Sequence, residues 1–267
     1  MRTEAMPTLF VSHGAPTFAL EPGLLGPKLG SLGRSMPRPR AVLVVSPHWM
    51  TRGVQVTRTV APETIHDFGG FDPALYELHY PAPGAPALAD QAIELLNGSG
   101  WPARGNDRRG LDHGVWVPML HLLPEADLPV LQVSMPVDLD ARSAYALGQA
   151  LAPLREQGVF IVGSGSLTHN LHEFRGATQS GAASYAKEFA AWSRNTVLAR
   201  DHERLLHTME LAPHAQRAHP TTDHLLPLLL AAGAAGTSAA VTVLDGGITH
   251  GVLAMDSFVF GLDGQLH

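Results

Sequence analysis

AVLVVSPHW, residues 41–49, is the stretch of sequence that decides the fold. Its first six residues are almost continuously apolar and rich in valine, which is typical of a strand buried on both faces of a sheet. The stretches TLFVS at 8–12 and VFIVG at 159–163 share this pattern. Strands covered on both faces predict an α/β fold, because helices must supply the cover.

Short strands and longer amphipathic stretches alternate along the rest of the chain. The other strands that the sequence predicts are residues 54–59, 130–134, 241–245 and 257–260. The predicted helices are residues 85–96, 115–122, 141–157, 182–200, 201–211 and 222–232. This order predicts a single catalytic domain over residues 1–267, with a central mixed, mostly parallel β-sheet and helices on both faces.

Two long stretches rich in proline and glycine separate the predicted elements. Residues 14–40 hold five prolines and five glycines, and residues 61–86 hold five prolines and three glycines. We expect both to be loops, and loops this long in a compact domain usually cover or serve a site. Residues 66–84 also cluster aromatic side chains, which suits either a loop packed by its own rings or a wall for an aromatic ligand.

The composition narrows the chemistry. The chain has 267 residues, 45% hydrophobic and 16% charged, and this balance predicts a compact fold rather than a disordered chain. A net charge of -6 gives no basic footprint for nucleic acid. Without cysteine the chain has no disulfide and no thiolate ligand, so its 15 histidines and its carboxylates are the expected metal ligands.

Targeting and membrane signals are not apparent in the sequence. Glu4 interrupts the N-terminal stretch, and the apolar run that follows is too short for a signal peptide. The most apolar later stretch, residues 225–235, is shorter than the roughly 18 residues of a spanning helix. We therefore expect a cytoplasmic protein without a membrane partner.

A histidine closely follows each of the three apolar strands: His13, His48 and His169. In open α/β sheets, ligands bind at the carboxyl ends of the strands. If these strands run parallel, their ends meet at one edge of the sheet and the three imidazoles converge there. The repeated placement of these histidines therefore predicts a functional site at that edge.

Two further histidines stand where helices are expected to begin. His224 lies in HPTTDHLLPLL, residues 219–229, in which Asp223 suits the positive end of a helix dipole. His113 lies between a polar turn and the helix expected over residues 115–122. Both positions allow a side chain to reach the sheet edge, and both also suit a purely structural histidine.

Six motifs, each containing a histidine, occur in an order that resembles a known family. They are LFVSHGAPTFAL (9–20), VVSPHWMTRG (44–53), IHDFGGFDPALYELHYPAPG (65–84), GLDHGVWVPMLHLLPEADLPVLQVS (110–134), GSGSLTHNL (163–171) and HPTTDHLLPLL (219–229). The sequence resembles the class III extradiol ring-cleaving dioxygenases, and within them the DOPA 4,5-dioxygenase-like branch. The resemblance covers nearly the whole chain.

This resemblance implies a non-haem Fe(II) enzyme that opens a catechol ring beside its two hydroxyls, using O2, to give a semialdehyde. By position, His13, His48 and His224 match the metal ligands, and His224 stands where some more distant relatives have a glutamate. His169 matches a catalytic base that can also touch the metal before substrate binds. His113 matches a second acid–base residue.

Imidazole suits each of these implied roles. Three protein ligands leave open positions for a catechol and O2, and neutral ligands leave the full 2+ charge on the metal, which lowers the pKa of a bound hydroxyl. An imidazole pKa near 6.5 lets one histidine accept a phenolic proton and another donate one. His66, in the aromatic segment, is a weaker candidate for substrate binding.

Some alternatives stay open. An all-histidine site also suits Zn(II), so a zinc hydrolase or a non-catalytic metal-binding relative fits the same residues. The sequence does not select the native catechol or the ring bond that is cleaved. It also leaves open whether the protein is a monomer or a homodimer.

Overall fold

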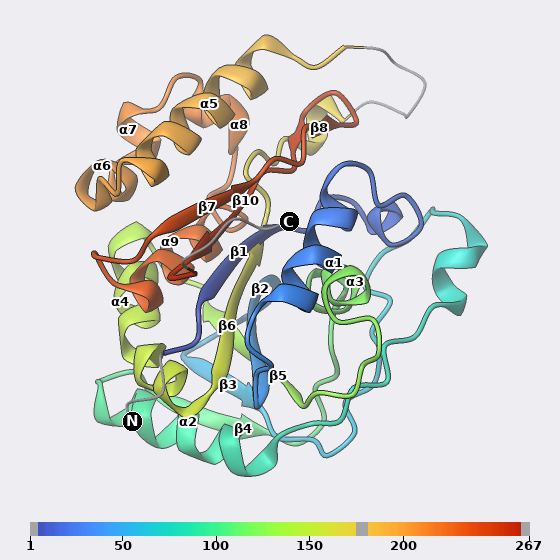
Figure 1. The fold of residues 1–267 in the computed structure, drawn as a ribbon, viewed down its shortest axis with the longest axis vertical. Coiled ribbons are helices and arrows are strands. Elements are labelled where there is room, and N and C mark those ends of the chain that lie inside the picture. The colour runs from blue at the N-terminus through green and yellow to red at the C-terminus, as the bar shows by residue number, and fades with distance from the viewer. Residues whose placement is uncertain (1–4, 175–180, 263–267) are drawn as a thin grey trace.

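An eight-stranded sheet crosses the centre of the molecule in the order β4-β3-β5-β2-β6-β1-β10-β7 (Figure 1). The computed structural model describes residues 5–174 and 181–262, and the remaining residues of the predicted domain lie outside this part. The strands of this sheet are β1 (Thr8–Ser12), β2 (Ala41–Thr51), β3 (Val54–Thr57), β4 (Ala103–Asn106), β5 (Val130–Pro136), β6 (Val159–Gly165), β7 (Val241–Leu244) and β10 (Ser257–Phe260). A separate two-stranded hairpin is formed by β8 (Ile248–Thr249) and β9 (Leu253–Ala254).

The four central strands run parallel. β2 pairs with β5 and with β6, and β6 pairs with β1, all in parallel register. Antiparallel pairs flank this core, since β1 pairs with β10 and β3 pairs with β5. Every residue of β1, β5 and β6 is buried, as expected for strands covered on both faces. The predicted mixed α/β sheet is therefore confirmed.

Nine α-helices are formed by the described residues. They are α1 (Leu25–Ser35), α2 (Pro86–Gly98), α3 (His113–Leu122), α4 (Ala141–Leu151), α5 (Ser184–Leu198), α6 (His202–Leu206), α7 (Thr208–Leu211), α8 (Ala215–Ala218) and α9 (Leu226–Ala235). Short 3-10 helices add η1 (Pro16–Ala19), η2 (Pro73–Glu77), η3 (Ala152–Gln157) and η4 (Leu171–Glu173).

Two neighbouring residues of β6 show that helices cover both faces of the sheet. A Cβ on Gly163 would meet the carbonyl oxygen of Pro227 in α9, whereas the hydroxyl of Ser164 donates to the carbonyl of Gly114 in α3. Successive strand residues point to opposite faces, so α9 and α3 lie on opposite sides of the sheet. Figure 1 shows α4 beside α9 on one side and α1 beside α3 on the other.

Several predicted elements differ from the structure. Residues 14–40 were expected to form a loop, yet they contain α1, whose Leu25, Leu29 and Leu32 follow a helical spacing and are fully buried. The glycines that suggested a loop instead allow close packing, because a Cβ on Gly33 would strike the carbonyl oxygen of Leu122. Tertiary packing therefore overrides the weak helix propensity of this stretch.

Other predicted boundaries were also wrong. The helix predicted over 201–211 breaks at His207 into α6 and α7, and the helix predicted over 222–232 begins only at Leu226, after a turn. The helix predicted over 141–157 ends at Leu151 and continues as η3. Strand β4, helix α8 and the β8–β9 hairpin were missed, because they are short and lack a clear apolar period.

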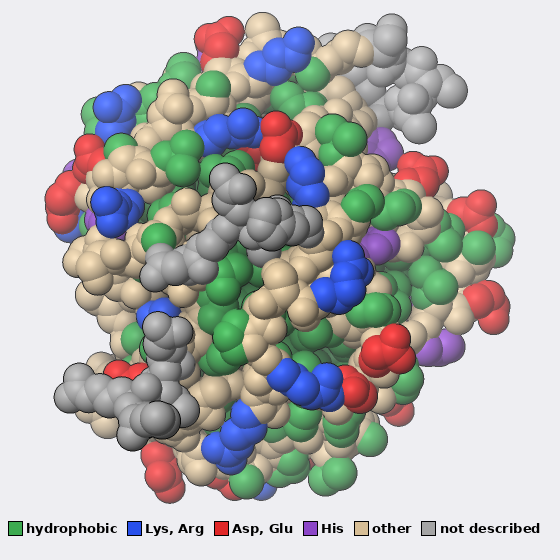
Figure 2. All heavy atoms as spheres, in the orientation of Figure 1, with side chains coloured by type: hydrophobic (Ala, Val, Ile, Leu, Met, Phe, Trp, Pro, Cys, Tyr) green, Lys and Arg blue, Asp and Glu red, His purple; other side chains and the backbone are tan. Residues whose placement is uncertain are grey.

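The apolar core lies on both faces of the sheet, and charged side chains lie at the surface. The buried apolar side chains on both faces of the sheet form one cluster in the part of the chain that the structure describes. On the face shown in Figure 2, side chains of both charge signs are interspersed with apolar ones. Within residues 5–174 and 181–262, no helix combines the length and the hydropathy needed to cross a bilayer.

Candidate metal centre and active site

The carboxyl ends of β1, β2 and β6 meet at one edge of the sheet, and their histidines meet there too. His13 follows β1, and its Nε2 lies 3.2 Å from Nε2 of His48. His48 lies where the register between β2 and β5 shifts, and such an irregularity re-aims a strand side chain. His169 follows β6, so the expected convergence of the three imidazoles is confirmed.

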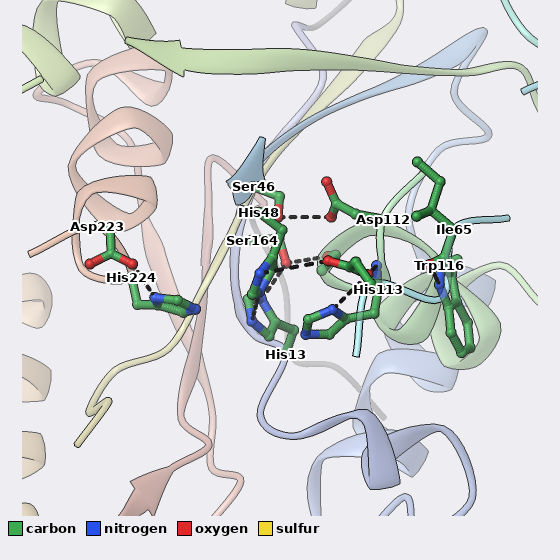
Figure 3. Close-up of polar contacts among 12 residues, drawn as sticks. His13, Ser46, His48, Ile65, Asp112, His113, Trp116, Ser164, Asp223 and His224 are labelled. Atoms are coloured by element: carbon green, nitrogen blue, oxygen red, sulfur yellow. Dashed lines mark hydrogen bonds and ion pairs between the residues drawn. The ribbon is translucent and has the colours of Figure 1, made fainter. Parts of the chain in front are cut away.

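His113 and His224 reach the same edge from opposite faces of the sheet (Figure 3). His113 is the first residue of α3, and its ring centroid lies 4.0 Å from that of His48. His224 lies in the turn before α9, with its ring 5.1 Å from His48 and 5.4 Å from His13. His169 stacks on His224 at 3.5 Å. All five expected histidines therefore surround one space.

In His13 and His224, a hydrogen bond engages Nδ1, the ring nitrogen that faces away from the cluster. Ser164 gives its hydroxyl proton to the carbonyl of Gly114, so it accepts from Nδ1–H of His13 at 3.0 Å. His224 donates from Nδ1 to Asp223 at 2.6 Å, and its buried Nε2 has no hydrogen-bond partner. Such outer contacts orient metal-binding histidines and leave the inner nitrogen with a free lone pair. The site therefore fits a metal ion.

The geometry allows two choices for the third metal ligand. The nitrogens of His13, His48 and His113 lie within 4.8 Å of one another. The expected set has His224 in place of His113, and the unpartnered Nε2 of His224 supports that set. A carboxylate holds Nδ1 of both candidates, Asp67 for His113 and Asp223 for His224, so this contact does not distinguish them.

Asp67 links the aromatic segment to the histidines. Its Oδ1 accepts from both the backbone N–H and Nδ1–H of His113, each at 2.9 Å, and its Oδ2 lies 3.8 Å from Nδ1 of His48. Partial burial raises the pKa of Asp67, but the hydrogen bonds and charge of His113 outweigh it and lower the pKa to about 2. The residue is therefore an ionised carboxylate near neutral pH.

Burial also sets the charge of the rings. Removal from water, reinforced by the other imidazoles, lowers the pKa of His13, lowers that of His48 to about 2 and lowers that of His169 to about 3. The three rings are neutral near pH 7. Neutral imidazole is the form that binds a metal ion or accepts a proton.

A buried carboxylate lies beneath His48 and His113. Asp112 accepts from the hydroxyl of Ser46 and from Nη2 of Arg109, each at 3.0 Å, and from the amide of Gln132. Arg109 also donates to the backbone carbonyl of His48 at 3.1 Å. This network ties β2 and β5 to the start of α3, and so holds the two histidines in register.

The histidines line a cavity of about 450 Å³. The sequence did not single out Asp67 or Asp112, although each adjoins a candidate histidine, because their contacts are made across the fold.

His66 is not among the residues that line the cavity. Its Nε2 lies 3.0 Å from the carbonyl of Leu78, and its ring packs on Trp116, so no contact here supports its expected role in substrate binding.

Comparison with known proteins now identifies the family. The model for the catalytic LigB subunit of aromatic ring-opening dioxygenase matches residues 31–253. The chain belongs to this family. It is also 38% identical to a 4,5-DOPA dioxygenase extradiol of Beta vulgaris, over 95% of this chain and 96% of the relative. A protein of Escherichia coli K12 with the same name is 37% identical, over 98% of this chain and 97% of the relative.

A solved structure agrees with this LigB fold. An uncharacterized protein of Escherichia coli K12 superposes with a TM-score of 0.80 and 32% identity, over 96% of this chain and 100% of that chain. The resemblance to extradiol dioxygenases is therefore confirmed, and the histidine cluster is the metal-binding candidate of an aromatic ring-opening dioxygenase.

Proposed function

We propose that this chain is an Fe(II)-dependent extradiol dioxygenase that opens the ring of a DOPA-like or related catechol with O2. The observation that carries this proposal is the convergence of five imidazoles on one cavity, with Nε2 of His224 buried and unpartnered. The names of the relatives in Beta vulgaris and Escherichia coli support the reaction class.

His13, His48 and His224 would hold the metal through their Nε2 atoms, since Nδ1 is engaged in His13 and His224. When bound, Fe(II) supplies positive charge that lowers the pKa of catechol hydroxyls and open positions for the catechol and O2. Imidazole alone does not exclude Zn(II), which suits the same donors.

His169 is the proposed base. Its ring is neutral near pH 7, stacks on His224 and lines the same cavity as the proposed ligands. A neutral imidazole there can accept the proton that a catechol hydroxyl releases on binding. Its stacking also restricts the ring to one plane, which limits the substrate poses it can serve.

His113 is the proposed acid. Asp67 holds its Nδ1, so Nε2 is the nitrogen left to act on a substrate in the cavity. The carboxylate fixes the orientation of the ring and can stabilise positive charge on it while it delivers a proton to the substrate oxygen. The proposed base, His169, and the proposed acid, His113, thus both lie next to the proposed ligands, so one can accept a substrate proton and the other can donate one.

The decisive experiment is anaerobic loading with Fe(II), followed by addition of a catechol and O2. We expect O2 uptake equal to catechol consumed, a yellow product and a product mass equal to the substrate plus one O2. Zinc-loaded protein serves as the matched control and should not consume O2. Absence of uptake with every catechol contradicts the proposal, and ester or amide hydrolysis by the zinc form would then identify a hydrolase. Metal binding without either reaction would identify a non-catalytic relative.

A further inference from the structure

Beyond its histidines, the cavity is apolar. The walls are formed by residues from the aromatic segment, from the chain after β1 and β6, and from β9. These residues are Pro16, Phe68, Phe71, Leu171, Phe174 and Leu253. At about 450 Å³, the cavity has more room than a bare catechol ring fills. The remaining space is therefore available to a substituent on that ring.

The aromatic walls are held by their own neighbours. Phe68 packs edge-on against Phe71 at 5.6 Å and against His113 at 5.7 Å. Phe174 stacks on His250 at 4.4 Å, and Nε2 of His250 lies 3.3 Å from the hydroxyl of Thr17. These contacts restrict the rings and so reduce the ordering that substrate binding would require.

The charged side chains described near the site, Arg109, Asp67 and Asp223, already have hydrogen-bond partners. No Asp, Glu, Lys or Arg lines this cavity among residues 5–174 and 181–262. Arg109 donates to Asp112 and to the carbonyl of His48, and Asp67 and Asp223 accept from histidines. Among the described residues, a charged substituent would meet no charged side chain on these walls, whereas an apolar one gains by burial.

We propose that the preferred substrate is a catechol with an uncharged, apolar substituent, an alkyl or aryl group, seated against Phe68, Phe71 and Phe174. This inference rests on the proposed ring-opening function and names its substrate class. It departs from the amino-acid side chain of DOPA, for which the relatives are named. In this site the metal and the histidines select the catechol, and the phenylalanines select the group attached to it.

The test uses catechols of similar size and different charge on the Fe(II)-loaded enzyme. These are 4-propylcatechol, dopamine, 3-(3,4-dihydroxyphenyl)propionate and DOPA. We expect kcat/KM for the neutral catechol to exceed that for each charged one by about tenfold or more, mainly through KM, as apolar pockets discriminate by such factors. Calorimetry with the zinc-loaded protein, which needs no turnover, should give the same order of affinities.

Equal or higher kcat/KM for any of the charged catechols would overturn this inference and leave ring opening intact. If the enzyme cleaved none of the four catechols, that result would instead contradict the proposed function. Phe71→Ala should reduce the preference for 4-propylcatechol, whereas Leu211→Ala, an exposed apolar residue of α7, should leave it unchanged. A Phe71→Ala enzyme that loses the same factor for neutral and charged catechols would also contradict the proposal.

Discussion

The two regions that build the site differ in how they are held. At the sheet edge, His13 follows a fully buried strand and is itself 1% exposed. In the aromatic segment opposite it, the rings of Phe68 and Phe71 are partly exposed, and Asp67 bonds to His113. In the proposed function, the buried sheet edge would hold the metal and the outer segment would set the fit to the substrate.

Removal of a metal ligand should have the largest effect. We expect His224→Ala to bind no stoichiometric iron and to show no measurable turnover, because only two of the three proposed ligands, His13 and His48, remain. His113→Ala should keep its iron and lose activity by about 10²- to 10⁴-fold, the usual contribution of an acid–base group. Metal analysis beside kcat measures both effects. Iron loss in His113→Ala with retention in His224→Ala would show that His113 is the third ligand.

His169 tests the sheet edge without removing a ligand of the proposed set. His169→Ala should lower kcat by about 10²- to 10⁴-fold while iron content and the fold persist. His172→Ala, at an exposed position of η4, is the matched control and should keep full activity. An active His169→Ala enzyme would disprove the role of His169 as the base.

Asp67 tests the link between the two regions. Asp67→Ala should lower kcat or metal affinity by about 10- to 100-fold, since it removes the carboxylate that orients a histidine at the metal site. Asp67→Asn should recover part of the loss, because its carbonyl oxygen can still accept from the backbone N–H of His113. Steady-state kinetics and metal titration give the comparison. Equal loss in both variants would mean that orientation contributes little.

Unfolding should also distinguish the sheet from the aromatic segment. Leu43 in β2 is fully buried, so Leu43→Ala should reduce the free energy of unfolding by about 2–5 kcal/mol. Phe71→Ala, at a partly exposed ring of the outer segment, should cost clearly less. Urea unfolding of the metal-free proteins measures both. An equal cost would show that the aromatic segment is as integral to the fold as the sheet.

The smallest expected effect concerns pH. His219 is buried against Phe189, and burial lowers its pKa from 6.5 to about 4. Between these values the unfolded chain binds more protons than the folded one, so the free energy of unfolding should fall as pH decreases through this window. The variant His219→Gln should show a shallower fall in urea titrations of the metal-free protein. An unchanged slope would assign the acid sensitivity to other groups.

The sequence predicted the parts of the fold that depend on local pattern. Strands β1, β2 and β6 were found because continuous apolar runs are recognisable without their partners. Helix α1 was missed because its glycines look like loop residues until Leu122 is seen against Gly33. The five histidines were predicted to share a site, partly from their places after strands and partly from the family resemblance.

The sequence by itself determined that strands buried on both faces end in histidines, since strand period and burial are written in neighbouring residues. Only the tertiary structure decided that His113 and His224 arrive from opposite faces and that Asp67 bonds His113. It also decided that phenylalanines, rather than charged groups, complete the described cavity. These features depend on contacts between residues far apart in the chain, and no local pattern specifies such contacts.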